Sequence, residues 1–235
     1  MEEKITKIYE NEDYVVINKP AGLVVNRSNT STSETLQDIL DDEFDAYQAT
    51  GESDFAARSG IVHRLDKDTS GVLVVAKNEE TFKNLQRQFK DRQTTKEYLA
   101  VVYGVIEDAI IDVDAPIKRN PNSPLKLAVV AGGKPSQTHI ELIKTFKCGE
   151  NDYSSVRVLP RTGRTHQIRV HLAALNHPIV GDTVYAPRNM LASSENDFGR
   201  LMLHAHMLGF SDPTGSKAVE YTAPIPSEFQ PYVTL

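Results

Sequence analysis

The chain has 235 residues and a formal net charge of −6, with 40% hydrophobic and 25% charged residues. This composition is that of an ordinary globular protein, long enough to bury a core of its own. The single cysteine, Cys148, excludes an intrachain disulfide and a cysteine-rich zinc site, and it favours a reducing compartment. The first residues show no signal-peptide pattern, and no segment approaches the ~18 apolar residues of a membrane helix. We therefore expect a cytoplasmic protein that does not enter a membrane.

The acidic excess is concentrated in one part of the chain. Residues 31–54 contain eight acidic residues and no Lys or Arg, whereas residues 157–171 contain four arginines and no acidic residue. Binding of a polyanion depends on where the charge lies more than on its sum. A basic surface for nucleic acid is therefore compatible with the negative net charge.

Short hydrophobic runs bounded by turn residues predict strands, and apolar residues at helical spacing predict helices. In the first part of the chain these patterns predict strands over 14–18 and 71–76, a helix over 34–48 and an amphipathic helix over 79–91. Phe44 and Tyr47 belong to the apolar face of the first helix, and Ser33 is its expected N-cap.

Strand patterns dominate the remaining sequence. They cover residues 96–106, 110–114, 126–131, 137–146, 153–159, 201–210 and 217–222, and one helix is expected over 165–176. Many strands with few helices, in no regular alternation, predict an α+β fold with a mainly antiparallel sheet. No linker or repeat divides the chain, so we expect one domain over residues 1–235.

Asp66 lies in a loop between a strand expected to end at His63 and the buried strand 71–76. Thr69, Ser70 and Gly71 suit a tight turn. A carboxylate held on such a loop is able to act as a nucleophile or a base. In isolation, however, the pattern is more typical of an Asp that forms a turn or a cap.

Tyr98 is a second candidate, in the strand 96–106. Alternation places it on the same face as Lys96 and Ala100. Its ring is a surface for base stacking and its hydroxyl is able to move a proton, although a half-buried structural tyrosine explains the pattern equally well.

The segment 161–172 leads from a turn into a helix and is rich in arginine. Free N–H groups and the helix dipole at such a helix start attract anions, so Arg164, His166 and Gln167 are candidate substrate-binding residues. Arg169 shares its helix face with the apolar Ile168 and Leu172. A charge on such a face needs a carboxylate partner.

These segments, taken in order, resemble the RluA-type family of RNA pseudouridine synthases. The matching segments extend over nearly the whole chain: residues 18–25, 63–71, 96–100, 162–169, 177–182, Tyr185, 203–205 and 223–224. The order and spacing of the segments together are specific to this family.

The resemblance implies a role for each candidate. Asp66 matches the catalytic aspartate that forms the covalent link to the nucleotide, with the sugar C1′ and the base C6 both open as the point of attack. Tyr98 matches the tyrosine that stacks on the target base and is a proposed proton acceptor. Arg169 matches the arginine that forms an ion pair with the catalytic aspartate. Arg64 matches an arginine that takes the place of the flipped base, and Ile168 matches an apolar residue beside the active site.

The resemblance also implies a bent, mixed, mainly antiparallel sheet with flanking helices and a central catalytic cleft. Many relatives carry an N-terminal S4 RNA-binding domain, and we expect this chain to be a single catalytic domain without one. The expected partner is structured RNA, ribosomal or transfer RNA, and the expected state is a monomer. Because the isomerisation involves no redox step, we expect no cofactor and no metal.

Three other functions deserve comparison. A metal hydrolase would use the histidines, but His166 and His171 are five residues apart, which is a poor spacing for a zinc helix. A glycosidase or nucleosidase would use Asp66 with Asp68. A non-catalytic RNA-binding module would need neither Asp66 nor Tyr98 nor Arg169, and all three are present.

Overall fold

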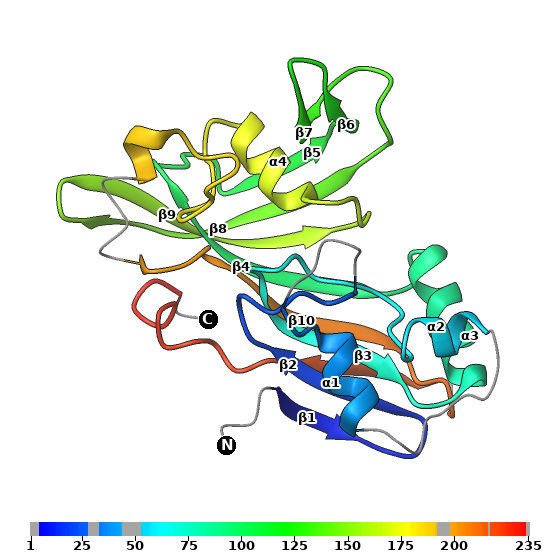
Figure 1. Ribbon diagram of the computed structural model, residues 1–235. Helices are drawn as coiled ribbons and strands as arrows, with labels where there is room; N and C mark the ends of the chain where they lie inside the picture. The colour runs from blue at the N-terminus through cyan, green and yellow to red at the C-terminus, as the bar shows by residue number, and fades with distance from the viewer. Residues whose placement is uncertain (1–4, 28–32, 44–52, 192–197, 216, 234–235) are drawn as a thin grey trace. The chain divides into compact units, whose positions relative to one another are not determined.

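The computed structural model describes residues 5–27, 33–43, 53–191, 198–215 and 217–233 (Figure 1). The chain forms two compact units. Unit 1 consists of Met1–Thr95 with Ala205–Pro224, and unit 2 of Lys96–His204 with Ile225–Leu235. The chain passes from one unit to the other inside two strands, after Thr95 in β4 and after His204 in β10.

Unit 1 contains the first part of the sheet, in the strand order β1-β2-β3-β10, with β11 paired to β10. The strands are β1 (Thr6–Glu10), β2 (Tyr14–Lys19), β3 (Ser70–Ala76), β10 (Leu203–Ser211) and β11 (Ala218–Thr222). The pairs β1–β2, β2–β3 and β10–β11 are antiparallel. Every residue of β3 is buried, as expected for an apolar central strand.

The helices of unit 1 are α1 (Leu36–Glu43), α2 (Asp54–Ala57) and α3 (Glu79–Lys90). Asn78 caps α3, since its side chain accepts a hydrogen bond from the Thr81 amide at 2.9 Å. Phe82 and Leu85 of α3 are buried, and α3 packs against β3. The Phe55 ring of α2 meets the Phe82 ring edge-on at 5.7 Å between centroids.

Unit 2 contains the strand order β4-β9-β8-β5. These are β4 (Thr95–Tyr103), β5 (Ile110–Asp114), β8 (Gln137–Cys148) and β9 (Asn151–Pro160), and their pairings are antiparallel. A separate antiparallel hairpin is formed by β6 (Ile117–Asn120) and β7 (Ser123–Val129).

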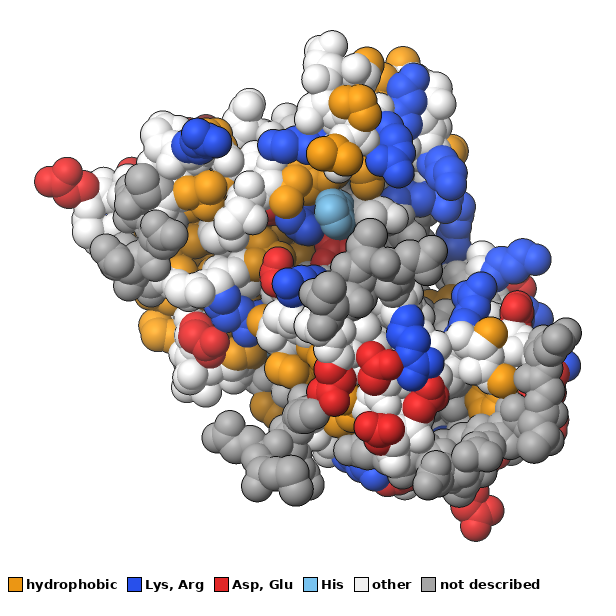
Figure 2. Space-filling model, viewed as in Figure 1, with side chains coloured by type: hydrophobic (Ala, Val, Ile, Leu, Met, Phe, Trp, Pro, Cys, Tyr) orange, Lys and Arg blue, Asp and Glu red, His pale blue; other side chains and the backbone are white. Residues whose placement is uncertain are grey.

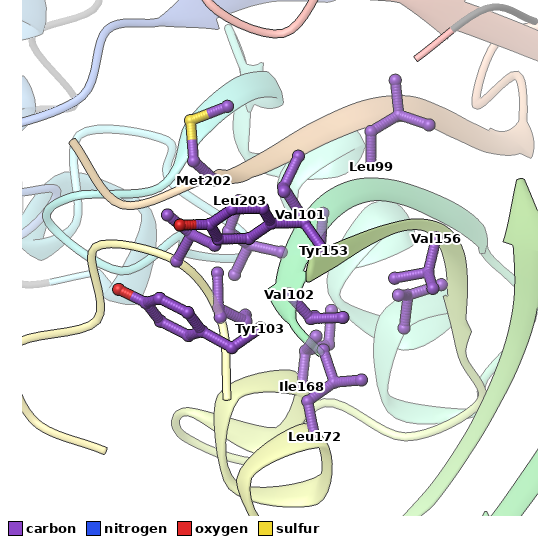
Figure 3. Close-up of a cluster of buried hydrophobic side chains, with 14 of the residues drawn as sticks. Leu99, Val101, Val102, Tyr103, Tyr153, Val156, Ile168, Leu172, Met202 and Leu203 are labelled. Atoms are coloured by element: carbon purple, nitrogen blue, oxygen red, sulfur yellow. The ribbon is translucent and has the colours of Figure 1, made fainter. Parts of the chain in front are cut away.

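The helix α4 (Gln167–Ala174) packs against β9 and β7. Its residues from Gln167 to Leu172 are all buried, so the helix is enclosed rather than amphipathic. Figure 3 shows Ile168 and Leu172 pointing from α4 toward Val102 of β4 in the hydrophobic core of unit 2. This core fixes the helix that carries Arg169.

The expected α+β fold with a mainly antiparallel sheet is confirmed. The strands expected at 14–18, 71–76, 110–114 and 217–222 lie within one residue of β2, β3, β5 and β11. The sequence patterns missed β1, β6 and α2. The helix expected over 34–48 is observed as α1, and Phe44 and Tyr47 lie outside the described residues. The helix expected over 165–176 is shorter: α4 extends from Gln167 to Ala174, and His166 and Asn176 on either side have positive φ values, which a helix does not accommodate.

Candidate active site

Asp66 begins a β-turn in unit 1, and its side chain is half-buried. The Asp66 carbonyl accepts a hydrogen bond from the Thr69 amide at 3.2 Å, so Lys67 and Asp68 form the exposed corner. Gly71 follows, with a φ of +121°, and an added Cβ would lie 2.1 Å from the Ala205 carbonyl oxygen of β10. Only glycine fits this close approach, so Gly71 fixes where the turn enters β3.

Lys19, at the end of β2, holds this turn through the Lys67 carbonyl. It is fully buried, and its ammonium donates hydrogen bonds to the carbonyls of Pro20, Leu23 and Lys67 at 2.8, 2.9 and 3.0 Å. The Lys67 carbonyl also accepts from the Gly22 amide at 2.9 Å. The loop over 19–23 and the turn after Asp66 are thereby joined into one braced structure.

His63 fixes the chain just before Asp66. Its Nε2 accepts a hydrogen bond from the Val74 amide of β3 at 3.1 Å, and its ring stacks on Phe89 of α3 at 4.4 Å between centroids. Because Nε2 is an acceptor here, this contact requires the neutral imidazole with its proton on Nδ1. The strand expected to end at His63 is reduced to a single bridge between Ile61 and Val75.

In unit 2, the turn before α4 is organised around the buried Gln167. Its Oε1 accepts from the Thr162 hydroxyl at 2.7 Å and the Arg164 amide at 3.0 Å. Its Nε2 donates to the Gln137 carbonyl and to the Thr138 hydroxyl, at 2.9 and 3.0 Å. These four hydrogen bonds occupy the amide within the protein, which favours a structural role for Gln167 over direct substrate binding.

The apolar helix face of Arg169 predicts a carboxylate partner, and Asp182 is such a partner. The Arg169 Nε donates to Asp182 Oδ2 and Nη2 donates to Oδ1, both at 2.8 Å. This is a side-on, two-pronged ion pair between side chains only 7% and 0% exposed. The sequence patterns gave Asp182 no role, because the pair depends on a tertiary contact.

Tyr185 covers the same guanidinium. The Arg169 Cζ lies 5.2 Å from the centre of the Tyr185 ring, and the Tyr185 hydroxyl hydrogen-bonds His166 Nδ1 at 2.9 Å. His166 precedes α4 with a φ of +52°, which is uncommon for a residue other than glycine. His166 and Arg169 therefore belong to one cluster with Asp182 and Tyr185.

The other predicted residues are distributed between the units. Tyr98 of β4 is half-buried and packs at the edge of the unit 2 core, which contains Ile168. Arg164 is half-buried, and its Nε donates to the Pro135 carbonyl at 3.2 Å. Arg64 is exposed in unit 1, beside Asp66. Sequence reasoning gave no role to Lys19, Asp182 or Tyr185, and considered His63 only as a metal ligand, although each lies in a segment that resembles the family.

The histidines of the metal hydrolase alternative have other partners. His171 is fully buried, hydrogen-bonded to the Thr138 hydroxyl at 2.8 Å and to the Ala115 carbonyl at 3.0 Å. Burial lowers the pKa of His171, which favours the neutral form of its ring. Among the described residues, no three His, Cys, Asp or Glu side chains are grouped so that they would hold a metal ion.

The sequence profile of the RNA pseudouridylate synthase family matches residues 13–174. The chain belongs to this family. Its members are isomerases that convert uridine in RNA to pseudouridine. The matched region includes Asp66, Tyr98 and Arg169, and it ends at the last residue of α4.

Relatives in this family support the same conclusion. The chain is 43% identical over 213 residues to an uncharacterized RNA pseudouridine synthase of Chloroflexus aurantiacus, covering 91% of this chain and 63% of the relative. It is 38% identical to the uncharacterized RNA pseudouridine synthase YlyB of Bacillus subtilis, covering 94% and 69%. It is also 38% identical to ribosomal large subunit pseudouridine synthase D of Pasteurella multocida, covering 94% and 68%. The chain thus spans about two thirds of the length of these relatives.

Solved structures of pseudouridylate synthases share the fold. Human RNA pseudouridylate synthase domain containing 1 matches with a TM-score of 0.76 and 32% identity, over 95% of this chain and 84% of the other. Human RNA pseudouridylate synthase domain containing 4 matches in fold with a TM-score of 0.72, at 24% identity, over 96% and 90%. Within the described part of the chain, no helix has the length and apolar character needed to cross a membrane.

Proposed function

We propose that this chain isomerises uridine to pseudouridine in ribosomal RNA, with Asp66 as the nucleophile. The observation that carries the proposal is the braced turn of Asp66 inside the region that matches the family. A nucleophile must be held in one geometry relative to the sugar or base that it attacks. Three contacts supply that restraint. Lys19 holds the Lys67 carbonyl, His63 is hydrogen-bonded to the Val74 amide, and Gly71 packs against the Ala205 carbonyl.

The reaction balances without a redox partner. Asp66 forms a covalent bond to the nucleotide, the bond between N1 and C1′ breaks, and the base turns. C5 then bonds to C1′, and the bond to Asp66 breaks, which restores the carboxylate. The C5 proton leaves to an acceptor, for which we propose Tyr98, and N1 gains a proton. Tyr98 also offers a ring on which the flipped base stacks, worth ~1–3 kcal/mol for each stacked base. Arg169 would pair with Asp66, and Arg64 would fill the space that the base leaves.

Ribosomal RNA is the favoured substrate over transfer RNA because several relatives bear the name ribosomal large subunit pseudouridine synthase D. A ribosomal substrate would place the enzyme in the cytoplasm. We also propose that both units act as one catalytic domain and that the enzyme is a monomer. The family match supports the first point, because residues 13–174 include parts of both units.

The surface of unit 2 carries charge suited to RNA. The segment 116–134, which contains the β6–β7 hairpin, has four basic residues and no acidic residue. These are Lys118, Arg119, Lys126 and Lys134, all exposed. Figure 2 shows Lys and Arg side chains gathered over this part of unit 2. Contacts between such side chains and phosphates supply affinity that is independent of sequence.

The proposal predicts that Asp66→Asn abolishes pseudouridine formation, because the amide is a far weaker nucleophile than the carboxylate. Pseudouridine formation expels the hydrogen on C5, so tritium release from RNA labelled at that carbon measures turnover directly. The substrate is total RNA from a strain that lacks the gene. Mapping pseudouridines in the same RNA then locates the target and separates ribosomal from transfer RNA.

Asp68→Asn is the matched control, because Asp68 is an exposed carboxylate two residues away in the same turn. Asp68→Asn should retain turnover within about threefold of wild type, as surface changes leave the active site intact. Wild-type activity in Asp66→Asn would refute the role of Asp66. Loss of activity in both variants, with release of free uracil by the wild type, would instead support the nucleosidase alternative.

A further inference from the structure

Arg169 and Asp182 form a buried ion pair in unit 2, and the proposed chemistry assigns no role to Asp182. Arg169 donates two of the five N–H groups of its guanidinium to Asp182, and both hydrogen bonds measure 2.8 Å. Three donors of the guanidinium are not used in this pair. Because the pair is side-on, Asp182 determines the plane of the guanidinium and the direction of those remaining donors.

Asp182 is itself held rigidly. Its Oδ1 accepts hydrogen bonds from the amides of Val184 and Tyr185 at 3.0 and 3.1 Å. The preceding Gly181 has a φ of +75°, and an added Cβ would lie 2.1 Å from the Arg200 carbonyl oxygen. Val180 is hydrogen-bonded to the Val101 carbonyl of β4 at 2.9 Å. The carboxylate is therefore attached to the sheet through a short, tightly packed turn.

The same turn supplies a second restraint on Arg169. The Tyr185 ring lies against the guanidinium at 5.2 Å, and its hydroxyl accepts from the Leu127 amide of β7 at 3.3 Å. Lys126 of the hairpin also contacts the Val184 carbonyl. Thus the turn after Gly181 links the helix that carries Arg169 to the basic β6–β7 hairpin.

We propose that Asp182 is a positioning residue for the reaction, which holds the guanidinium of Arg169 in the orientation that the catalytic step needs. This inference rests on the proposed function. Asp182 touches no reacting atom and acts through Arg169 alone. It also balances the charge of Arg169 inside the protein, where an unpaired guanidinium would be costly.

Asp182→Asn tests the proposal because it preserves shape and removes the charge. If the Asn oxygen keeps the two backbone amides, its NH₂ group faces the Arg169 Nε–H, and two donors oppose each other. The guanidinium then reorients. Loss of the hydrogen-bond partner that orients a metal ligand typically costs about 10- to 100-fold in activity, and by analogy we expect a loss of single-turnover rate in this range.

The measurement is tritium release under single-turnover conditions with saturating enzyme, alongside the Kd for RNA and circular dichroism of each variant. We expect the Kd to stay within about threefold, since affinity comes from phosphate contacts elsewhere. Asp112→Asn makes the same chemical change in an exposed ion pair of unit 2, where Asp112 is 67% exposed and lies 2.9 Å from His139. It should leave the rate within about twofold.

A double-mutant cycle with Arg169→Lys separates positioning from general damage. Lysine lacks the planar fork, so Asp182 has no orientation to impose on it. In the Arg169→Lys background, Asp182→Asn should therefore cost less than about threefold, whereas additive losses would contradict action through Arg169. If Asp182→Asn does not fold, Asp182→Glu keeps the charge and displaces the carboxylate by one methylene. A displacement of this size is expected to slow the reaction at least about tenfold.

A folded Asp182→Asn or Asp182→Glu variant with the wild-type rate would overturn the inference and leave the proposed function standing. A wild-type chain that forms no pseudouridine in any RNA would overturn the proposed function, and this inference with it. The two failures are thus distinguished by the wild-type measurement alone.

Discussion

At the scale of residues, the position of Asp66 depends on backbone groups that its neighbours hold in place. The Lys67 carbonyl is the anchor point, because it accepts from both the Lys19 ammonium and the Gly22 amide. A short loop that carries a catalytic carboxylate would otherwise be free to open. Lys19 is thus better understood as the brace of the turn than as a charge for binding RNA, since it is fully buried.

Lys19→Met should destabilise the fold by about 1–3 kcal/mol, because the carbonyls of Pro20, Leu23 and Lys67 each lose one hydrogen-bond donor while the side chain keeps nearly the same length. Urea unfolding followed by circular dichroism measures the loss. Lys83→Met is the matched control, since the Lys83 side chain is exposed on α3 and pairs with the exposed Glu79 of the same helix at 2.6 Å. It should change stability by less than about 0.5 kcal/mol. Equal effects in the two variants would argue against the bracing role.

At the scale of elements, burial decides what the sequence reveals. The buried strands β2 and β3 each contain a continuous apolar run, and both were predicted within a residue. By contrast, β1 and β6 are largely exposed and short, so no hydrophobic pattern marks them. The residues of the candidate site also differ in how far the sequence reveals them. Asp66, Tyr98 and Arg169 are recognisable from their segments, whereas the pairing of Arg169 with Asp182 arises only when α4 packs beside residues 179–185.

The β6–β7 hairpin offers a prediction at this scale. Replacing Lys118, Arg119 and Lys126 with Gln should weaken RNA binding at low salt. The slope of log Kd against log salt should fall by up to about three, because each lost phosphate contact removes about one unit. Leu125 of β7, which is 95% exposed, stays in place, so the apolar part of the hairpin is unchanged. Filter binding from 50 to 300 mM salt (chosen as roughly the range where such contacts dominate) measures the slope.

The matched control replaces Lys83, Arg87 and Lys90 of α3 with Gln, which removes the same charge from unit 1. The segment 79–91 also contains Glu79, Glu80 and Asp91, so its basic residues are offset by its own acids. We expect the α3 variant to bind RNA with nearly the wild-type salt slope. A larger effect from α3 than from the hairpin would show that the RNA-binding surface lies elsewhere.

At the scale of the whole molecule, the net charge of −6 conceals two surfaces of opposite sign. Acidic side chains gather over α1 in unit 1, while the basic hairpin belongs to unit 2 (Figure 2). Exposed charges of this kind are screened by salt and contribute little to stability near neutral pH. Changes in stability between pH 7.5 and 5.5 (roughly the interval in which histidine titrates) should therefore come mainly from histidines whose surroundings shift their pKa.

His171 and His139 should affect that dependence in opposite directions. Burial lowers the pKa of His171, so acidification protonates it in the unfolded chain before the folded one, and stability falls below about pH 6.5. The hydrogen bond that His139 donates to Asp112 raises the pKa of His139, so its contribution to stability is present below about pH 6.5 and is lost as the pH rises. Each proton bound differently changes the free energy of unfolding by at most about 1.4 kcal/mol per pH unit.

His171→Gln should consequently destabilise the protein more at pH 7.5 than at pH 5.5 (conditions on either side of the ordinary histidine pKa of about 6.5). His139→Gln should show the reverse and a smaller effect, because its ion pair is exposed to solvent. Urea unfolding at the two pH values, with the difference from wild type taken at each, provides the comparison. The stability loss of the two variants could instead change in the same direction between the two pH values. That result would mean that His171 contributes to stability through packing and not through its neutral form.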